Sequence, residues 1–211
     1  MFGQIGLTLT ELLAPPLCWA CREHAPRGEP LCRRCRGALV FLDPVPVSLA
    51  GVRVWAPVAY EGPARDLVKA LKFRGGTGVA DAMAALVVAS APATLLDAPL
   101  VPVPLHPARL RRRAFNQARV LADAIGARTG LEVRACLARA GPNAAQVGRG
   151  RAVRLAGPAD SFAAVDPVPR RVVLVDDVVT TGGTLAACAA ALRVAGAGEV
   201  GALAFARTPG R

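Results

Sequence analysis

Two adjacent carboxylates followed by a run of small residues form the first segment whose residue types could do chemistry. The segment VVLVDDVVTTGGT spans residues 172–184. Its apolar start, residues 172–175, is typical of a buried central strand in a parallel sheet. Asp176 and Asp177 then lie toward the carboxyl end of that strand, where ligands bind in open α/β sheets. The segment therefore predicts a ligand site that contains two acids.

The run Thr180-Thr181-Gly182-Gly183-Thr184 leads into a predicted helix, and its chemistry complements that of the acids. Small residues let backbone N–H groups approach an anion, and the start of a helix adds a favourable dipole. A ligand with a phosphate and a vicinal diol would satisfy both parts, and a 5-phosphoribosyl group has both. The alternative is structural: the acids end a strand and the run is only a turn. The segment matches neither G-x4-G-K-[ST] nor G-x-G-x-x-G.

Cysteine spacing gives the second chemical signal. Four of the six cysteines fall in two Cys-x2-Cys pairs: Cys18, Cys21, Cys32 and Cys35. Each pair places two sulfurs on one tight turn, and two pairs supply the tetrahedral thiolates of a zinc site. Two disulfides are the alternative, but they are typical of exported proteins, and the N-terminus does not read as a secretory signal. Four cysteines leave no open coordination position, so we expect Zn²⁺ to be structural.

Composition and charge limit the class of protein. Hydrophobic residues make up 53% of the 211 residues and charged residues 19%, which suits a chain with a buried core. We expect no membrane span, because no apolar stretch reaches about 18 residues without interruption, and we expect the cytoplasm as the compartment. The net charge of +11 attracts phosphates and nucleic acids, although an arginine-rich bias of the source would also produce it.

Hydrophobic periodicity predicts an alternation of strands and helices after residue 50. Strands are expected over 52–60, 99–105, 131–140, 170–179 and 199–207, and helices over 3–14, 63–73, 80–90, 111–130 and 184–197. This alternation predicts an α/β fold with a mostly parallel sheet flanked by helices. A proline-rich stretch at 43–46 marks a boundary, so we expect a cysteine-rich zinc-binding module over 1–48 and an α/β domain over 49–211.

The loop at 172–184 resembles the motif that binds phosphoribosyl pyrophosphate (PRPP) in type I phosphoribosyltransferases. Other segments are similar to the ComF family, competence-associated phosphoribosyltransferase-like proteins with an N-terminal double zinc ribbon. They are the cysteine pairs, YEGPARDLVKALKFRGG (60–76), VPVPLHPARLRRRAFNQARVLA (101–122) and QVGRGRAVRLAGPADSF (146–162). The resemblance covers nearly the whole chain and implies a type I phosphoribosyltransferase fold. Ala114 and Gly157 depart from the family, which usually has Gly and Asn there.

The resemblance also implies roles for individual residues. Asp176 and Asp177 would hold the ribose hydroxyls of PRPP, and residues 180–184 would surround its 5-phosphate. Arg109 and the arginines at 111–113 would face the pyrophosphate together with Mg²⁺. A loop over 141–156 would close over the site, with Arg154 contributing to catalysis alongside Gln146, Arg149 and Arg151.

Two functions follow from the resemblance. The first is an enzyme, a Mg²⁺-dependent phosphoribosyltransferase (a pentosyl-transferring glycosyltransferase) that releases pyrophosphate and acts on an unknown acceptor. The second is a non-catalytic PRPP-fold protein that binds single-stranded DNA and works with the competence machinery in DNA uptake during natural transformation. Arginine clusters at 109–113 and 33–36 could contact a DNA backbone, but the aromatic residues needed for stacking are few and scattered.

Overall fold

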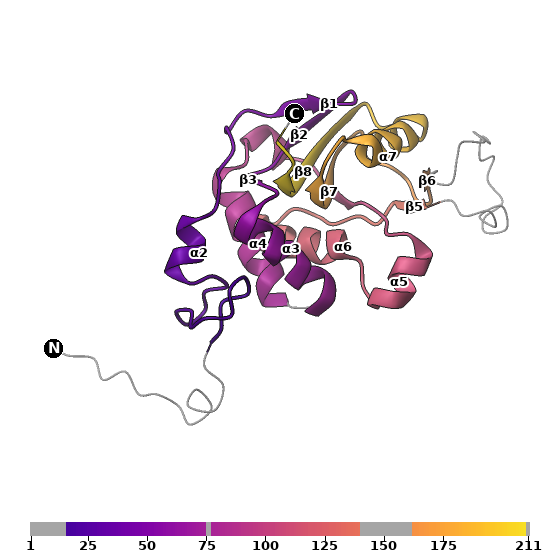
Figure 1. Ribbon diagram of the computed structural model, residues 1–211. Helices are drawn as coiled ribbons and strands as arrows, with labels where there is room; N and C mark the ends of the chain where they lie inside the picture. Colours follow the sequence, from indigo (N-terminus) through magenta and orange to yellow (C-terminus); the bar gives the residue numbers. More distant parts are fainter. Residues whose placement is uncertain (1–15, 75–76, 140–161, 210–211) are drawn as a thin grey trace.

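The computed structural model describes residues 16–74, 77–139 and 162–209, and its centre is a six-stranded sheet (Figure 1). The strands are β1 (Val47–Leu49), β2 (Val52–Trp55), β3 (Val58–Ala59), β4 (Leu100–Pro102), β7 (Arg171–Val179) and β8 (Glu199–Arg207). Across the sheet the order is β1-β2-β8-β7-β4, and β3 pairs with β8 after the end of β2. All of these pairings are parallel except that of β1 with β2. The predicted mostly parallel sheet is confirmed.

The two central strands, β7 and β8, are covered on both faces. β7 and β8 are buried along most of their length and pair from Arg171 with Glu199 to Val179 with Arg207. A strand that is covered on both faces reads as a continuous apolar run rather than an alternating one. The apolar run at 172–175 therefore predicted the centre of the sheet correctly.

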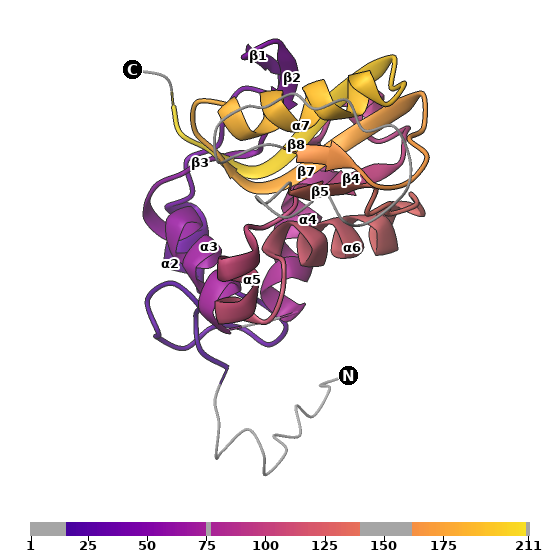
Figure 2. The same cartoon turned by 90° about the vertical axis from the view of Figure 1, so that its right-hand side faces the viewer.

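Helices pack on both faces of the sheet, so the molecule has three layers (Figure 2). On one face, α7 (Gly183–Val194) packs on the even-numbered residues Val172 and Leu174. On the other face, Val173 and Val175 lie in one buried cluster with side chains of three helices. These helices are α3 (Gly62–Arg74), α4 (Thr77–Ser90) and α6 (Gln117–Thr129). A separate two-stranded antiparallel sheet of β5 (Leu137–Arg139) and β6 (Phe162–Ala164) lies beside α7.

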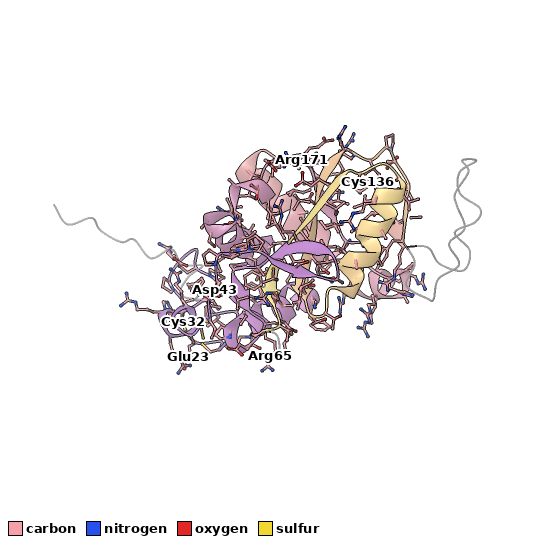
Figure 3. The ribbon with its side chains drawn as sticks, turned by 90° about the horizontal axis from the view of Figure 1, so that it is seen from above. Glu23, Cys32, Asp43, Arg65, Cys136 and Arg171 are labelled. Carbon is pink, nitrogen blue, oxygen red and sulfur yellow. The ribbon has the colours of Figure 1, made fainter. Side chains whose placement is uncertain are left out.

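The cysteine-rich segment packs against the α/β domain. It contains the short helix α2 (Arg33–Gly37), and its buried residues Cys18 and Leu31 belong to the same cluster as Leu67 of α3. Residues 40–42 then run antiparallel to β3, where the amide of Ala59 donates to the carbonyl of Val40. Figure 3 shows Cys32 at one end of the molecule and Cys136 and Arg171 at the other. The boundary after residue 48 stays a prediction, and β1 spans it.

Two predicted elements are corrected. The helix expected over 111–130 is two helices, α5 (Pro107–Arg113) and α6, because Ala114 adopts a left-handed conformation with φ 64° and Asn116 caps α6. The strand expected over 131–140 is limited to β5. A 3₁₀ turn, η1 (Ala93–Leu95), and the strands β1 and β6 were not predicted. The helix predicted over 3–14 and the loop predicted over 141–156 lie outside the described residues.

Candidate functional site

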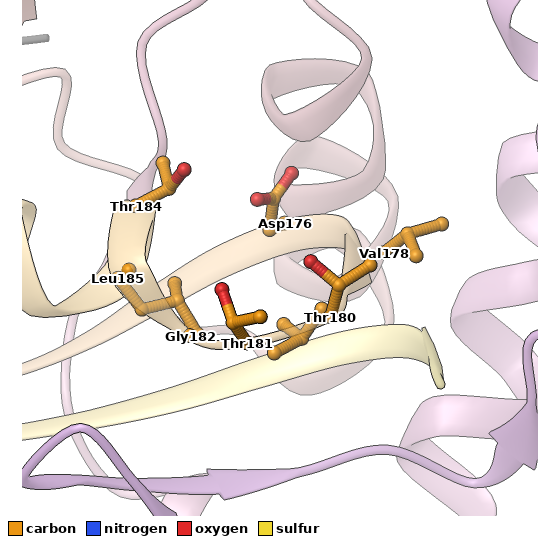
Figure 4. A pocket seen from close by; sticks show the side chains of 9 residues that line it. Asp176, Val178, Thr180, Thr181, Gly182, Thr184 and Leu185 are labelled. Carbon is orange, nitrogen blue, oxygen red and sulfur yellow. The ribbon is translucent and has the colours of Figure 1, made fainter. Parts of the chain in front are cut away.

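A pocket lies where β7 ends and α7 begins. It has an empty volume of about 260 Å³ and is lined by Asp176 and by every residue from Val178 to Leu185. In Figure 4 the hydroxyls of Thr180 and Thr181 point toward the side of the loop on which the Asp176 carboxylate lies. The structure therefore brings Asp176 and all five predicted phosphate-loop residues, 180–184, into one pocket.

Gly182 fixes the shape of this loop. Its φ of 80° lies in the left-handed region, and a Cβ at this position would lie 2.8 Å from the Cβ of Leu49 on β1. A side chain would therefore be strained by the backbone and would also clash with β1. Both constraints require glycine, so β1 and the loop are packed against each other without space for a methyl group.

The start of α7 offers hydrogen-bond donors to a ligand. Gly182 is its N-cap residue, no side chain caps the helix, and its first turn contains no acid. The first amides of a helix have no carbonyl partner within the helix, and the helix dipole places partial positive charge there. An anion in the pocket would accept from these amides, as phosphates do at many helix N-termini.

Asp176 is partly exposed and lies within the strand. The amide of Asp177 donates to its Oδ1 at 2.8 Å. Burial raises the pKa of Asp176 well above its ordinary value, and the charge of Asp177 raises it further. Hydroxyl donors or a divalent cation would stabilise its ionised form. The carboxylate is therefore placed to respond strongly to a ligand.

Asp177 lies on the opposite face of β7, because successive side chains of a strand alternate. It is 7% exposed, and its Oδ2 lies 2.8 Å from the Nζ of Lys72 on α3. The charge of Asp177 also acts on Arg113 of α5, so two basic side chains surround this acid. Lys72 was missed as a site residue. Its only sequence signal was the weak motif Lys72-Phe73-Arg74 before two glycines.

The basic helix α5 lies near Asp177. His106 caps it, with its Nδ1 accepting from the amide of Ala108 at 3.2 Å. Burial lowers the pKa of Arg113, and the charges of Arg112 and Arg109 lower it further, so these guanidiniums lie close enough to interact. Arg109 is exposed and does not line the loop pocket. Arg154 and its loop lie outside the described residues.

The four N-terminal cysteines form one cluster. The sulfurs of Cys18, Cys21, Cys32 and Cys35 all lie within 4.8 Å of one another, and three of the four residues are buried. Burial raises the pKa of the Cys35 thiol. At Cys18, backbone hydrogen bonds outweigh the effect of burial and lower the pKa to about 6. All six cysteines are free thiols, and within the described residues this is the only cluster with metal-ligand geometry. The cluster can hold a metal ion such as zinc.

A comparison with protein families matches the segment that contains this site, whereas a comparison with individual curated proteins finds no match. No helix in the described part of the chain is both long enough and apolar enough to cross a membrane. Residues 160–211 match the family model of the phosphoribosyl transferase domain, and this segment contains β7, the loop, α7 and β8. Together with the mostly parallel sheet, the match confirms a type I phosphoribosyltransferase fold. The small N-terminal module has a cysteine cluster whose geometry is compatible with a zinc ribbon.

Proposed function

We propose that the protein binds PRPP and, with Mg²⁺, transfers its 5-phosphoribosyl group to an acceptor with release of pyrophosphate. The loop pocket carries this proposal, because it combines uncapped helix amides, threonine hydroxyls and a carboxylate within the segment that matches the phosphoribosyl transferase domain. The 5-phosphate would lie on residues 180–184. Asp176 would hold the ribose hydroxyls from within the pocket. Asp177, which lies on the opposite face of β7 and pairs with Lys72, stays a proposed second partner of these hydroxyls.

The transfer step needs charge stabilisation more than it needs a nucleophile from the protein. The bond from the ribose C1 to the pyrophosphate oxygen breaks, and its electron pair leaves with the pyrophosphate. Mg²⁺, supported by Arg109 and the arginines at 111–113, would stabilise the departing charge. The acceptor atom then bonds to C1 and loses its proton to solvent. Arg154 stays a proposed catalytic residue.

The arginines of α5 favour a second candidate function. Arg109, Arg111 and Arg112 are exposed, and no acidic side chain among the described residues pairs with them. A ComF-like role would use this surface to bind single-stranded DNA in the cytoplasm during DNA uptake. Such binding should weaken as salt rises, with a log–log slope of about −0.7 per phosphate contact. A purely enzymatic protein should bind DNA weakly at every salt concentration.

Calorimetry with Mg²⁺ and PRPP tests the first proposal. Each charged hydrogen bond contributes roughly 1.5–3 kcal/mol, so the double variant Asp176→Asn/Asp177→Asn should lose at least about a hundredfold in PRPP affinity. The matched control is Asp123→Asn on α6, whose exposed carboxylate pairs with Arg119. Unchanged PRPP affinity in the double variant would contradict the proposed site. An assay of pyrophosphate release then separates transfer from binding alone.

We also propose that the cysteine cluster holds one structural Zn²⁺. Four thiolates with sulfurs within 4.8 Å of one another complete a tetrahedral shell and leave no position for a substrate. The metal would stabilise a segment with little apolar core of its own. In this proposal residues 1–48 form the zinc module and residues 49–211 the phosphoribosyltransferase domain.

A further inference from the structure

Gln117 is a buried polar residue whose side chain is only half satisfied. It is 3% exposed and lies at the start of α6, directly after the N-cap residue Asn116. Its Oε1 accepts from the Nη1 of Arg113 at 3.1 Å, whereas its Nε2 is buried and finds no acceptor in the described part of the chain. A buried donor without a partner lowers stability, so the fold alone does not explain a glutamine at this position.

The turn that carries Gln117 is fixed to the central sheet. The amide of Val103, the residue after β4, donates to the carbonyl of Val175 on β7 at 2.9 Å. The carbonyl of Val103 accepts from the Nδ2 of Asn116 at 2.9 Å, and the Oδ1 of Asn116 accepts from the amide of Ala118. These hydrogen bonds connect β7 to the first turn of α6, so Gln117 has a defined position relative to the strand that carries the acids.

Arg113 is the last residue of α5, and its guanidinium is restricted from several sides. Gln117 accepts from its Nη1, and the ring centroid of Phe73 lies 5.6 Å from its central carbon. The charge of Asp177 attracts the guanidinium, whereas neighbouring arginines of α5 repel it. A long side chain loses much rotamer freedom when it binds a ligand, unless the protein already holds it in place. The hydrogen bond to Gln117 supplies this restriction before any ligand arrives.

We propose that Gln117 is a positioning residue for phosphoribosyl transfer, whose amide oxygen holds the Arg113 guanidinium in the orientation that meets the pyrophosphate of PRPP. This role rests on the proposed function, in which the arginines of α5 stabilise the departing pyrophosphate. Because Gln117 is buried, it acts through Arg113 and does not itself contact PRPP. Its unpaired amide donor lowers stability, and the oriented arginine is the functional gain that offsets this loss.

The variant Gln117→Met separates this role from a structural one. Methionine is unbranched like glutamine and removes the acceptor for Arg113 and the unpaired donor together. We expect the urea unfolding midpoint to stay the same or to rise, and the affinity for PRPP with Mg²⁺ to fall by about tenfold in calorimetry. The affinity for ribose 5-phosphate should stay unchanged, because this ligand has no pyrophosphate. Equal weakening of both ligands, or a lower midpoint with unchanged PRPP affinity, would overturn the proposal.

Leu121→Met is the matched control. Leu121 is buried one helical turn further along α6, so this substitution perturbs the same face of the helix and leaves the contact between Gln117 and Arg113 intact. Its affinities for PRPP and for ribose 5-phosphate should equal those of the wild type. A tenfold loss of PRPP affinity in Leu121→Met would show that any change in this helix has the same effect, and would overturn the proposal.

A double-mutant cycle tests the contact itself. In the Arg113→Gln background, Gln117→Met should cause no further loss of PRPP affinity, because the group that Gln117 holds is absent. Additive losses would overturn the proposal. If Gln117→Met does not fold, Gln117→Leu replaces it in every measurement. Failure of both variants to fold would also overturn the proposal, because the fold itself would then require the glutamine.

The wild-type titrations separate this inference from the proposed function. If the wild type binds PRPP and Gln117→Met binds it equally well, the positioning role alone is wrong and the loop pocket stands. Absence of PRPP binding in the wild type would reject the proposed function and, with it, this role.

Discussion

Replacing Gly182 by alanine should strain the loop pocket from two directions. The residue has φ 80°, and the new Cβ would lie 2.8 Å from the Cβ of Leu49 and 3.4 Å from its backbone carbonyl. The Leu49 Cβ is the first atom of its side chain and the carbonyl belongs to the β1 backbone, so neither can move away without a shift of β1. The loop or β1 must therefore move, and the amides at the start of α7 should move with it.

The two effects have separate magnitudes. A left-handed conformation costs an L-residue about 1–2 kcal/mol. Overpacking a tight contact costs about 1–3 kcal/mol. Alanine recovers about 0.4–1 kcal/mol by restricting the unfolded chain. We therefore expect Gly182→Ala to lower the free energy of unfolding by roughly 1–4.5 kcal/mol.

Urea unfolding followed by tryptophan fluorescence measures this loss, because Trp55 is only 2% exposed in the folded protein. Gly183→Ala is the matched control. Gly183 begins α7, and its added Cβ would meet nothing nearer than the Thr181 hydroxyl at 3.8 Å, so Gly183→Ala should not lower stability and should raise it by up to about 1 kcal/mol. In a double-mutant cycle, Leu49→Gly should recover the steric part of the Gly182→Ala loss and leave the backbone part.

Equal stabilities of the Gly182→Ala and Gly183→Ala variants would refute this reasoning. A cycle in which Leu49→Gly recovers nothing would show that the β1 contact does not constrain the loop. Loss of PRPP binding in Gly182→Ala with unchanged stability would assign the glycine to ligand approach instead of packing.

Three further predictions follow from other features of the structure. Because the pKa of Asp176 is raised, its ionised form is unfavourable in the folded protein, so stability from this group is present at low pH and falls as pH rises through the raised pKa. In urea titrations Asp176→Asn should therefore be more stable than the wild type at neutral pH. The difference should vanish below the ordinary aspartate pKa of about 3.9. A stability difference that does not depend on pH would contradict this reasoning. Ala114→Gly should raise the free energy of unfolding by up to about 1 kcal/mol, since Ala114 has φ 64°, and a loss of stability would show that the αL strain is not the dominant effect. Metal analysis should find close to one zinc per chain in the reduced wild type and in Cys136→Ser, and none in Cys32→Ser; zinc retained by Cys32→Ser would rule out the four-cysteine site. Cys32→Ser should also lower the unfolding midpoint measured by tryptophan fluorescence, because the cysteine segment shares a buried cluster with Trp55.

The sequence predicted those parts of the site that are local in the chain. The strand at 170–179, the loop at 180–184 and the following helix are contiguous, and each has a strong signal in β-branched, small or alanine-rich residues. Their order places Asp176 beside the loop, whereas Asp177 points to the opposite face of β7 and does not line the pocket. For this reason Asp176 and residues 180–184 lie in one pocket as expected.

Contacts between distant segments could not be predicted in this way. Lys72 and Asp177 meet because α3 packs on the face of β7 toward which odd-numbered residues point, and no local pattern encodes that pairing. The break between α5 and α6 was missed for a different reason. Alanine and arginine favour helices, and this preference concealed Asn116, whose side chain accepts from the amide of Ala118 and donates to the carbonyl of Val103.

The short strand β1 has a practical consequence for any truncated form of this protein. It pairs antiparallel with β2 and is the edge strand at that end of the sheet, so β2 has no open edge. A fragment that begins after residue 48 would lack Val47 and Ser48, the β1 partners of Val54 and Arg53, and would leave that part of the β2 edge unpaired. Unpaired strand edges recruit strands from other molecules, so we expect such a fragment to self-associate. A tag or cut is better placed before Val47, where the antiparallel pair remains intact.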